Sequence, residues 1–131
     1  MKVAGLPILL ALIVSASAVG QSSPSVENRI IRGWLSDEEC ASGRASSGAF
    51  TGTNPTCAKE CVAKGKKIVF IDPEAKQVVK IENQDAARDH IGDYVEIEGT
   101  LSSRTKLLHI DSLRMLSRGV AECERPKLKR Q

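Results

Sequence analysis

Hydrophobic and polar residues alternate along much of the chain, as they do in half-buried β-strands. The clearest example is the stretch 94–99, which puts Val95 and Ile97 on one face and Glu96 and Glu98 on the other. Four further stretches that are rich in β-branched or aromatic residues also predict strands, and they cover 30–35, 67–71, 77–81 and 106–115. The pattern therefore predicts a mainly β chain with five strands.

Helix signals occur between these strands. Asn54 can cap the free N–H groups of a helix, Pro55 fits the first turn, and Gly65 can adopt the left-handed conformation that ends it. In such a helix Cys57 and Cys61 lie one turn apart on one side, which we expect to face inward.

The remaining segments complete the predicted order of elements. Residues 83–91 predict a brief helix closed by Gly92, and the Gly-, Ser- and Thr-rich segment Ala41–Thr53 predicts a long loop. The apolar parity of the last strand shifts after Ile110, which indicates a bulge of the kind that closes barrels. We therefore expect an OB-like Greek-key barrel with a short helix between strands 3 and 4 and an inserted short helix between strands 1 and 2.

The first 18 residues predict a cleavable signal peptide. Lys2 supplies a positive charge, an apolar run follows, and Ala16-Ser17-Ala18 matches the small-residue cleavage pattern. The apolar run is too short for a permanent membrane span. We expect a flexible leader over 19–28, a domain over 29–117 and a basic tail over 118–131, in a protein exported to a periplasm or to the cell exterior.

Charge and aromatic content disfavour nucleic acid as a partner. The chain carries 19 Lys and Arg against 16 Asp and Glu, and loss of Lys2 leaves 18 against 16, with the excess in the tail. The chain before the tail is therefore close to neutral, and it lacks the excess of Lys and Arg that binding to a phosphate backbone requires. Its few aromatic residues are Trp34 and Phe70, expected in the core, and Phe50 and Tyr94, expected nearer the surface, whereas base stacking needs exposed aromatic platforms.

The four cysteines are the strongest chemical signal. An exported chain with an even number of cysteines favours disulfides. Cys57 and Cys61 point the same way from one helix, which is a poor geometry for bonding each other. We expect Cys40 to pair with Cys57 or Cys61, and Cys123 to remain free or to pair with the other helical cysteine.

A metal site is the alternative use of the same sulfurs. Cys40, Cys57 and Cys61 could bind zinc with a fourth ligand such as His90, His109 or Cys123. Neither histidine lies within a ligand motif, so the disulfide is the preferred prediction, and no cofactor is expected.

No catalytic constellation is visible, and we expect no enzyme. No serine occupies a nucleophile elbow. The carboxylates Asp37, Glu38 and Glu39 cluster at the end of the first strand and could bind a cation, but solvated turn chemistry is the simpler interpretation.

Three stretches give the chain a family resemblance. They are 33–40 (Gly-Trp-Leu-Ser-Asp-Glu-Glu-Cys), 57–71, in which the Cys-x-x-x-Cys helix ends at Gly65, and 92–101 (Gly-Asp-Tyr-Val-Glu-Ile-Glu-Gly-Thr-Leu). Over about 29–116 the chain resembles small secreted bacterial OB-fold-like proteins grouped as a domain of unknown function. The resemblance implies export and an OB-like barrel, and it implies no activity. Some similar sequences carry a His shortly before the paired cysteines, whereas 51–56 contains none here.

Two hypotheses follow from the sequence. The first is an exported non-catalytic module that binds a small ligand, a glycan or an envelope protein through its barrel face or through the loop 41–53. The second is a thiol- or metal-binding protein that uses Cys40, Cys57 and Cys61.

Overall fold

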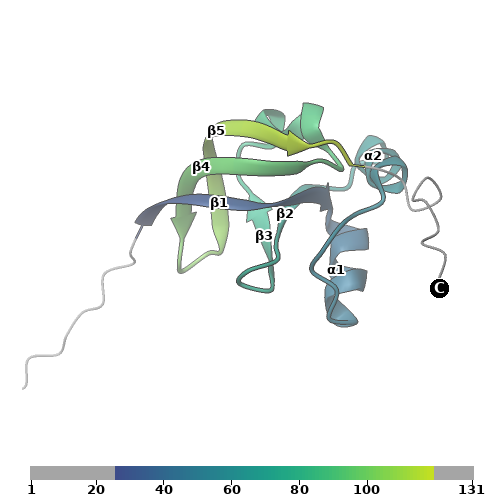
Figure 1. The fold of residues 1–131 in the computed structure, drawn as a ribbon, viewed down its shortest axis with the longest axis horizontal. Coiled ribbons are helices and arrows are strands. Elements are labelled where there is room, and N and C mark those ends of the chain that lie inside the picture. The colour runs from purple at the N-terminus through teal and green to yellow at the C-terminus, as the bar shows by residue number, and fades with distance from the viewer. Residues whose placement is uncertain (1–25, 120–131) are drawn as a thin grey trace, which may run out of the picture.

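A computed structural model describes residues 26–119 (Figure 1). Five strands and three helical segments follow one another in the order β1 (Val26–Asp37), α1 (Glu38–Ser46), α2 (Pro55–Ala63), β2 (Ile68–Asp72), β3 (Gln77–Ile81), the 3₁₀ helix η1 (Gln84–His90), β4 (Tyr94–Ser102) and β5 (Leu107–Ser117). The predicted signal peptide, most of the predicted leader, nearly all of the predicted basic tail and Cys123 lie outside the described residues.

The five strands close into a barrel. Their order around it is β1-β2-β3-β5-β4, and β4 pairs back onto β1 along nine residues of each strand, Val26 to Trp34 against Ser102 to Tyr94. All neighbours are antiparallel except β3 and β5, which pair in parallel through Lys80 with Leu107 and Ile81 with Leu108. The prediction of a mainly β chain with five strands is confirmed.

The interior of the barrel is filled by alternate residues of the strands. Val95 and Ile97 of β4 are fully buried, while Glu98, the next residue along, is exposed. Phe70 and Leu35 are the two largest side chains that are fully buried. Each side chain of this kind stabilises the fold by roughly 1.5–3 kcal/mol through removal of apolar surface from water.

The predicted irregularity in the last strand is present. Glu98 pairs with Ser112 and Gly99 pairs with Ile110, so the ladder between β4 and β5 passes over Asp111. The extra residue moves the later side chains of β5 to the opposite face of the strand. This explains why the alternation of apolar and polar residues shifts after Ile110.

Strand β1 is longer than the predicted 30–35 and begins at Val26. Its first residues pair with the far end of β4, where Val26 lies opposite Ser102. Val26 and Ile30 are both exposed, so backbone pairing rather than burial extends the strand there. An alternation of apolar and polar side chains cannot signal such a segment, because neither of its faces is buried.

The prediction of a loop over 41–53 is wrong in its first half, where α1 ends only at Ser46. One oxygen is enough to cap the start of this helix, because Asp37 Oδ2 accepts from the N–H groups of both Glu39 and Cys40. Ala41 is buried against Val69 and Ile71 of β2. The Gly and Ser residues of α1 disfavour a helix, so the packing of Ala41 against β2 is what stabilises it.

Helices α1 and α2 lie together at the end of the barrel where β1 ends (Figure 1). Helix α2 begins after Asn54, whose side-chain oxygen accepts from Cys57 N–H, and Gly65 beyond its end has a φ of 97°. The segment that follows β3 is a 3₁₀ helix, and Gly92 beyond it has a φ of 94°. Among the helices of residues 26–119, none combines the length and the apolar character that a membrane span needs.

Candidate metal centre

Three cysteine sulfurs meet where α1 and α2 come together. Cys40 comes from α1, and Cys57 and Cys61 come from α2. All three Sγ atoms lie within 4.8 Å of one another, and those of Cys40 and Cys57 are 3.3 Å apart. The three side chains are half-buried, so an ion could reach them from solvent. We call these three residues the thiol cluster.

The local folding of each helix places the sulfurs. The cap at Asp37 fixes the first turn of α1, in which Cys40 is the third residue after the cap. The cap at Asn54 fixes the first turn of α2 in the same way, with Cys57 the third residue after the cap. Cys61 follows Cys57 by four residues, and this spacing puts both side chains on one face of α2.

Asp37 is the charged neighbour of the thiol cluster. Its side chain is fully buried. Oδ2 accepts from two backbone N–H groups, each at 3.0 Å, while Oδ1 is buried and has no hydrogen-bond partner among the described residues. The sequence led us to expect this carboxylate in a solvated turn, and that expectation is wrong for Asp37.

Burial and this carboxylate both act on the thiols. Burial raises the pKa of Cys40 well above its ordinary value, and the adjacent Asp37 and Cys57 raise it further. Burial also raises the pKa of Cys61, followed by the negative charge of Asp37 and then by Cys57. Both effects favour the neutral thiol form of Cys40 and of Cys61.

The sulfur separations are longer than a covalent bond and are compatible with a shared ion. A disulfide joins sulfurs at about 2.05 Å, so the 3.3 Å between Cys40 and Cys57 leaves the three described cysteines as free thiols. Sulfurs about 2.3 Å from a tetrahedral zinc would lie roughly 3.8 Å from each other. The observed separations, from 3.3 Å to at most 4.8 Å, bracket that value.

The two histidines considered as ligands lie elsewhere. His109 is exposed on β5 with Nδ1 at 2.9 Å from Glu82 Oε2, and His90 Nδ1 lies 3.5 Å from Asp93 Oδ2. Over residues 26–119, the thiol cluster contains neither of them.

The sequence did not indicate the position of Asp37. The only available signal was an Asp three residues before a Cys, which is also the spacing of an ordinary helix cap.

The aromatic residues form no exposed row within residues 26–119. Phe70 is fully buried, as predicted, and Trp34 is partly buried, with its ring centroid 4.8 Å from that of Tyr94. Phe50, expected nearer the surface, packs against the small core cluster of Ala41, Val69 and Ile71.

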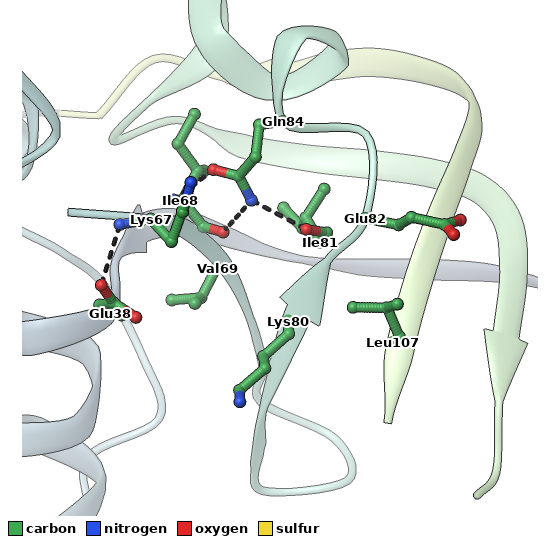
Figure 2. A pocket seen from close by; sticks show the side chains of 9 residues that line it. All are labelled: Glu38, Lys67, Ile68, Val69, Lys80, Ile81, Glu82, Gln84 and Leu107. Carbon is green, nitrogen blue, oxygen red and sulfur yellow. Dashed lines mark hydrogen bonds between the residues drawn. The ribbon is translucent and has the colours of Figure 1, made fainter. Parts of the chain in front are cut away.

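A small pocket lies next to Glu38, the first residue of α1 (Figure 2). Its volume is about 250 Å³, below the roughly 300–1,000 Å³ of most small-molecule sites. Figure 2 shows Gln84 bridging the N–H and carbonyl of Ile68 and the carbonyl of Ile81, and Glu38 accepting from Lys67 N–H. These polar groups are already satisfied within the chain, so the pocket does not define a ligand.

Comparisons with family models, with curated proteins and with solved structures found no match to this chain. Its function therefore has to be inferred from the arrangement of its own residues.

Proposed function

We propose that the reduced protein binds one divalent transition-metal ion of the zinc class through Cys40, Cys57 and Cys61. The observation that carries this proposal is the convergence of three sulfurs from two helices to within 4.8 Å of one another. Thiolate sulfur is the donor that zinc prefers in structural sites, where ligands from separate elements tie a small fold together.

The placement of the thiols supports this proposal. α1 and α2 contact each other only over a small area, and each is nine residues long, too short to be stable alone. An ion shared between them would link the two helices to each other and, through Asp37 at the junction, to β1. The function is binding and stabilisation, with no catalytic step.

We further propose that the barrel belongs to the OB type and that the protein works outside the cytoplasm. The strand order, the parallel pair of β3 and β5, and the helical segment between β3 and β4 support the first point. The signal-like segment 1–18 supports the second. N-terminal sequencing of exported material should begin at or near Val19, and a sequence that starts at Met1 would contradict export by cleavage.

The test of metal binding uses the full chain, purified with a reductant, stripped with a chelator and titrated with zinc and with cobalt. We expect one ion per chain, and we expect sulfur-to-cobalt charge-transfer absorption. Cys40→Ser, Cys57→Ser and Cys61→Ser should each lose this binding while keeping a β-type circular-dichroism spectrum. His109→Ala is the matched control, because it removes an alternative ligand that lies outside the cluster. Binding that survives all three cysteine variants would reject the proposal.

An intramolecular disulfide is the second candidate state, favoured by the 3.3 Å between the sulfurs of Cys40 and Cys57. Its formation would pass two electrons and two protons to an external disulfide by thiol exchange. Because it uses the same sulfurs, it competes with the metal. Peptide mapping after incubation with oxidised glutathione should find Cys40 joined to Cys57 only in the chelator-treated protein. A disulfide formed equally in zinc-loaded protein would make disulfide formation the better account.

A further inference from the structure

We propose that two copies of this chain pair through the first half of β1, edge to edge and antiparallel, with Asn28 on the twofold axis. This contact lies at the start of β1, whereas the thiol cluster lies beyond its end, so the proposal does not depend on metal binding.

The first half of β1 has a strand partner on one side only. β4 pairs with all of Val26 to Trp34, whereas β2 pairs only with Trp34 to Asp37. Figure 1 shows that β1 begins well beyond β2. Among residues 26–119, no strand pairs with the other edge of 26–33. A hollow of about 340 Å³ lies between this edge and the turn that follows β2, so the turn leaves the edge open.

The backbone groups of β1 alternate between its two edges. Leu35 N–H donates to Asp93 O, and Leu35 O accepts from Gly92 N–H, so the groups of Leu35 face the side of β4. Successive residues of an extended strand point these groups to opposite sides. The register with β4 has no break from Val26 to Trp34, so the even-numbered residues point their N–H and C=O groups to the open edge. Such unpaired groups are a template for a further strand.

The side chains of this segment are self-complementary. In an antiparallel pair centred on Asn28, Val26 of each copy lies opposite Ile30 of the other, and Glu27 lies opposite Arg29. Val26 and Ile30 are 69% and 68% exposed, so the pairing would cover apolar surface that the barrel leaves in water. Glu27 and Arg29 carry opposite charges on the other face. Apolar and opposite-charge pairs of this kind stabilise antiparallel strands.

Only this register satisfies both the backbone and the charges. It places even-numbered residues opposite even-numbered residues, so each such pair can exchange two hydrogen bonds across the open edge. An axis between two residues would oppose even and odd positions, whose groups point away from each other. An axis on Glu27 or on Arg29 would put two like charges directly opposite, which is destabilising.

The edge lacks the features that usually prevent such pairing. Proteins protect edge strands with lysine, proline or a bulge. Residues 26–32 read Val-Glu-Asn-Arg-Ile-Ile-Arg, with neither lysine nor proline, and the ladder to β4 is regular there. A twofold contact of one surface with itself closes as a dimer. Because the paired segment is short, we expect a weak dimer that dissociates on dilution.

The first experiment measures self-association of the full chain by sedimentation equilibrium, with reductant and chelator present, up to millimolar concentration. The wild type should show a monomer–dimer equilibrium. Glu27→Arg and Arg29→Glu should each dimerise roughly 10-fold more weakly or less, because each variant places like charges opposite one another. An equimolar mixture of the two variants should dimerise about as well as the wild type, since one strand then carries two positive charges and the other two negative charges.

Arg88→Glu is the matched control. Arg88 and Asp85 form an exposed ion pair on η1, as Arg29 and Glu27 do on β1. This variant should dimerise as the wild type does. All three variants should keep the urea-unfolding midpoint of the wild type, because exposed ion pairs contribute little to stability.

Hydrogen exchange locates the contact. Raising the protein concentration should slow exchange of the Asn28 and Ile30 amides, which face the open edge, and should leave those of Glu27 and Arg29 unchanged, because they face β4. A wild type that stays monomeric would overturn the proposal. So would charge variants that dimerise as the wild type does, a mixture that stays monomeric, or protection that appears on other strands, because association would then use another surface or another register.

Discussion

At the scale of single residues, Glu96 joins three strands on the outer face of the barrel. Its Oε2 accepts from Arg32 Nε on β1 and its Oε1 accepts from Arg114 Nη2 on β5, both at 2.7 Å. The two guanidinium groups hold the pKa of Glu96 below its ordinary value, and the same carboxylate raises the pKa of Arg32. The ionised form of Glu96 is therefore favoured in the folded protein.

This lowered pKa predicts a dependence of stability on acid. The stabilisation is fully present above the pKa of Glu96 in the unfolded chain, about 4.3, and it is lost as the pH falls through the lower folded-state pKa. Glu96→Gln should therefore lose less stability than the wild type between about pH 6 and pH 3, measured by urea unfolding. Glu98→Gln is the control, because its carboxylate contacts Ser112 rather than an arginine. If the free energy of unfolding falls equally with pH in the wild type and in Glu96→Gln, the stabilising role of ionised Glu96 is contradicted.

Two glycines give opposite predictions for the same substitution. A Cβ on Gly33 would overlap the carbonyl oxygen of Ile71 and lie 2.6 Å from the ring of Phe70, whereas a Cβ on Gly43 would meet nothing within 4 Å. Gly33→Ala should therefore destabilise the fold by about 1–3 kcal/mol through overpacking. Gly43→Ala in α1 should stabilise it by up to about 1 kcal/mol. Urea unfolding of both variants measures the difference, and equal effects would contradict it.

At the scale of elements, the two helices matter because they carry the sulfurs. α1 follows β1 without a linker, so the last residue of the strand is also the cap of the helix. α2 begins after Asn54 and presents Cys57 in its first turn. The positions of two of the three sulfurs thus depend on capped first turns, which fray easily when the cap is lost.

Removing the cap of α2 should affect stability and metal binding together. Asn54→Ala deletes the acceptor for Cys57 N–H and should lower the free energy of unfolding by about 1 kcal/mol. Zinc affinity should fall as well, since part of the binding free energy must then order the first turn of α2. Asn54→Ser keeps a capping oxygen and should retain both properties. Loss of stability without any loss of affinity would show that Cys57 does not need this turn.

At the scale of the whole molecule, the thiol cluster lies between the two helices that follow β1. The described part of the chain buries one continuous core inside the barrel and a second, smaller cluster beneath α1. The segment from Glu38 to Gly65 lies at one end of the barrel, and a shared ion there would restrain it in the folded state (Figure 1).

Zinc should therefore raise the melting temperature of the reduced protein. A ligand that binds only the folded state at 100 times its dissociation constant stabilises that state by about 2.7 kcal/mol. We expect a zinc-dependent shift in calorimetry that a chelator reverses, and no shift for Cys57→Ser. The disulfide would stabilise the fold by roughly 3 kcal/mol through loop closure, but its effect would depend on reductant and not on chelator.

The sequence by itself determined the strands and the ends of one helix. Alternation of apolar and polar residues is a local consequence of one buried face, so it located β3 and β4 closely and revealed the break after Ile110. Asn54 and Gly65 act through their own backbone geometry, which is why they marked α2 without knowledge of its neighbours.

Only the tertiary structure decided the helix α1 and the composition of the site. α1 has Gly and Ser where helices prefer other residues, and it is held by burial of Ala41 against β2, which is a contact between distant parts of the chain. Asp37 resembles an ordinary turn residue in its local sequence, and its burial depends on the packing of α1 and α2 at the end of β1. The approach of Cys40 to Cys57 has the same origin, because the distance between residues 17 positions apart is set by packing and not by sequence spacing.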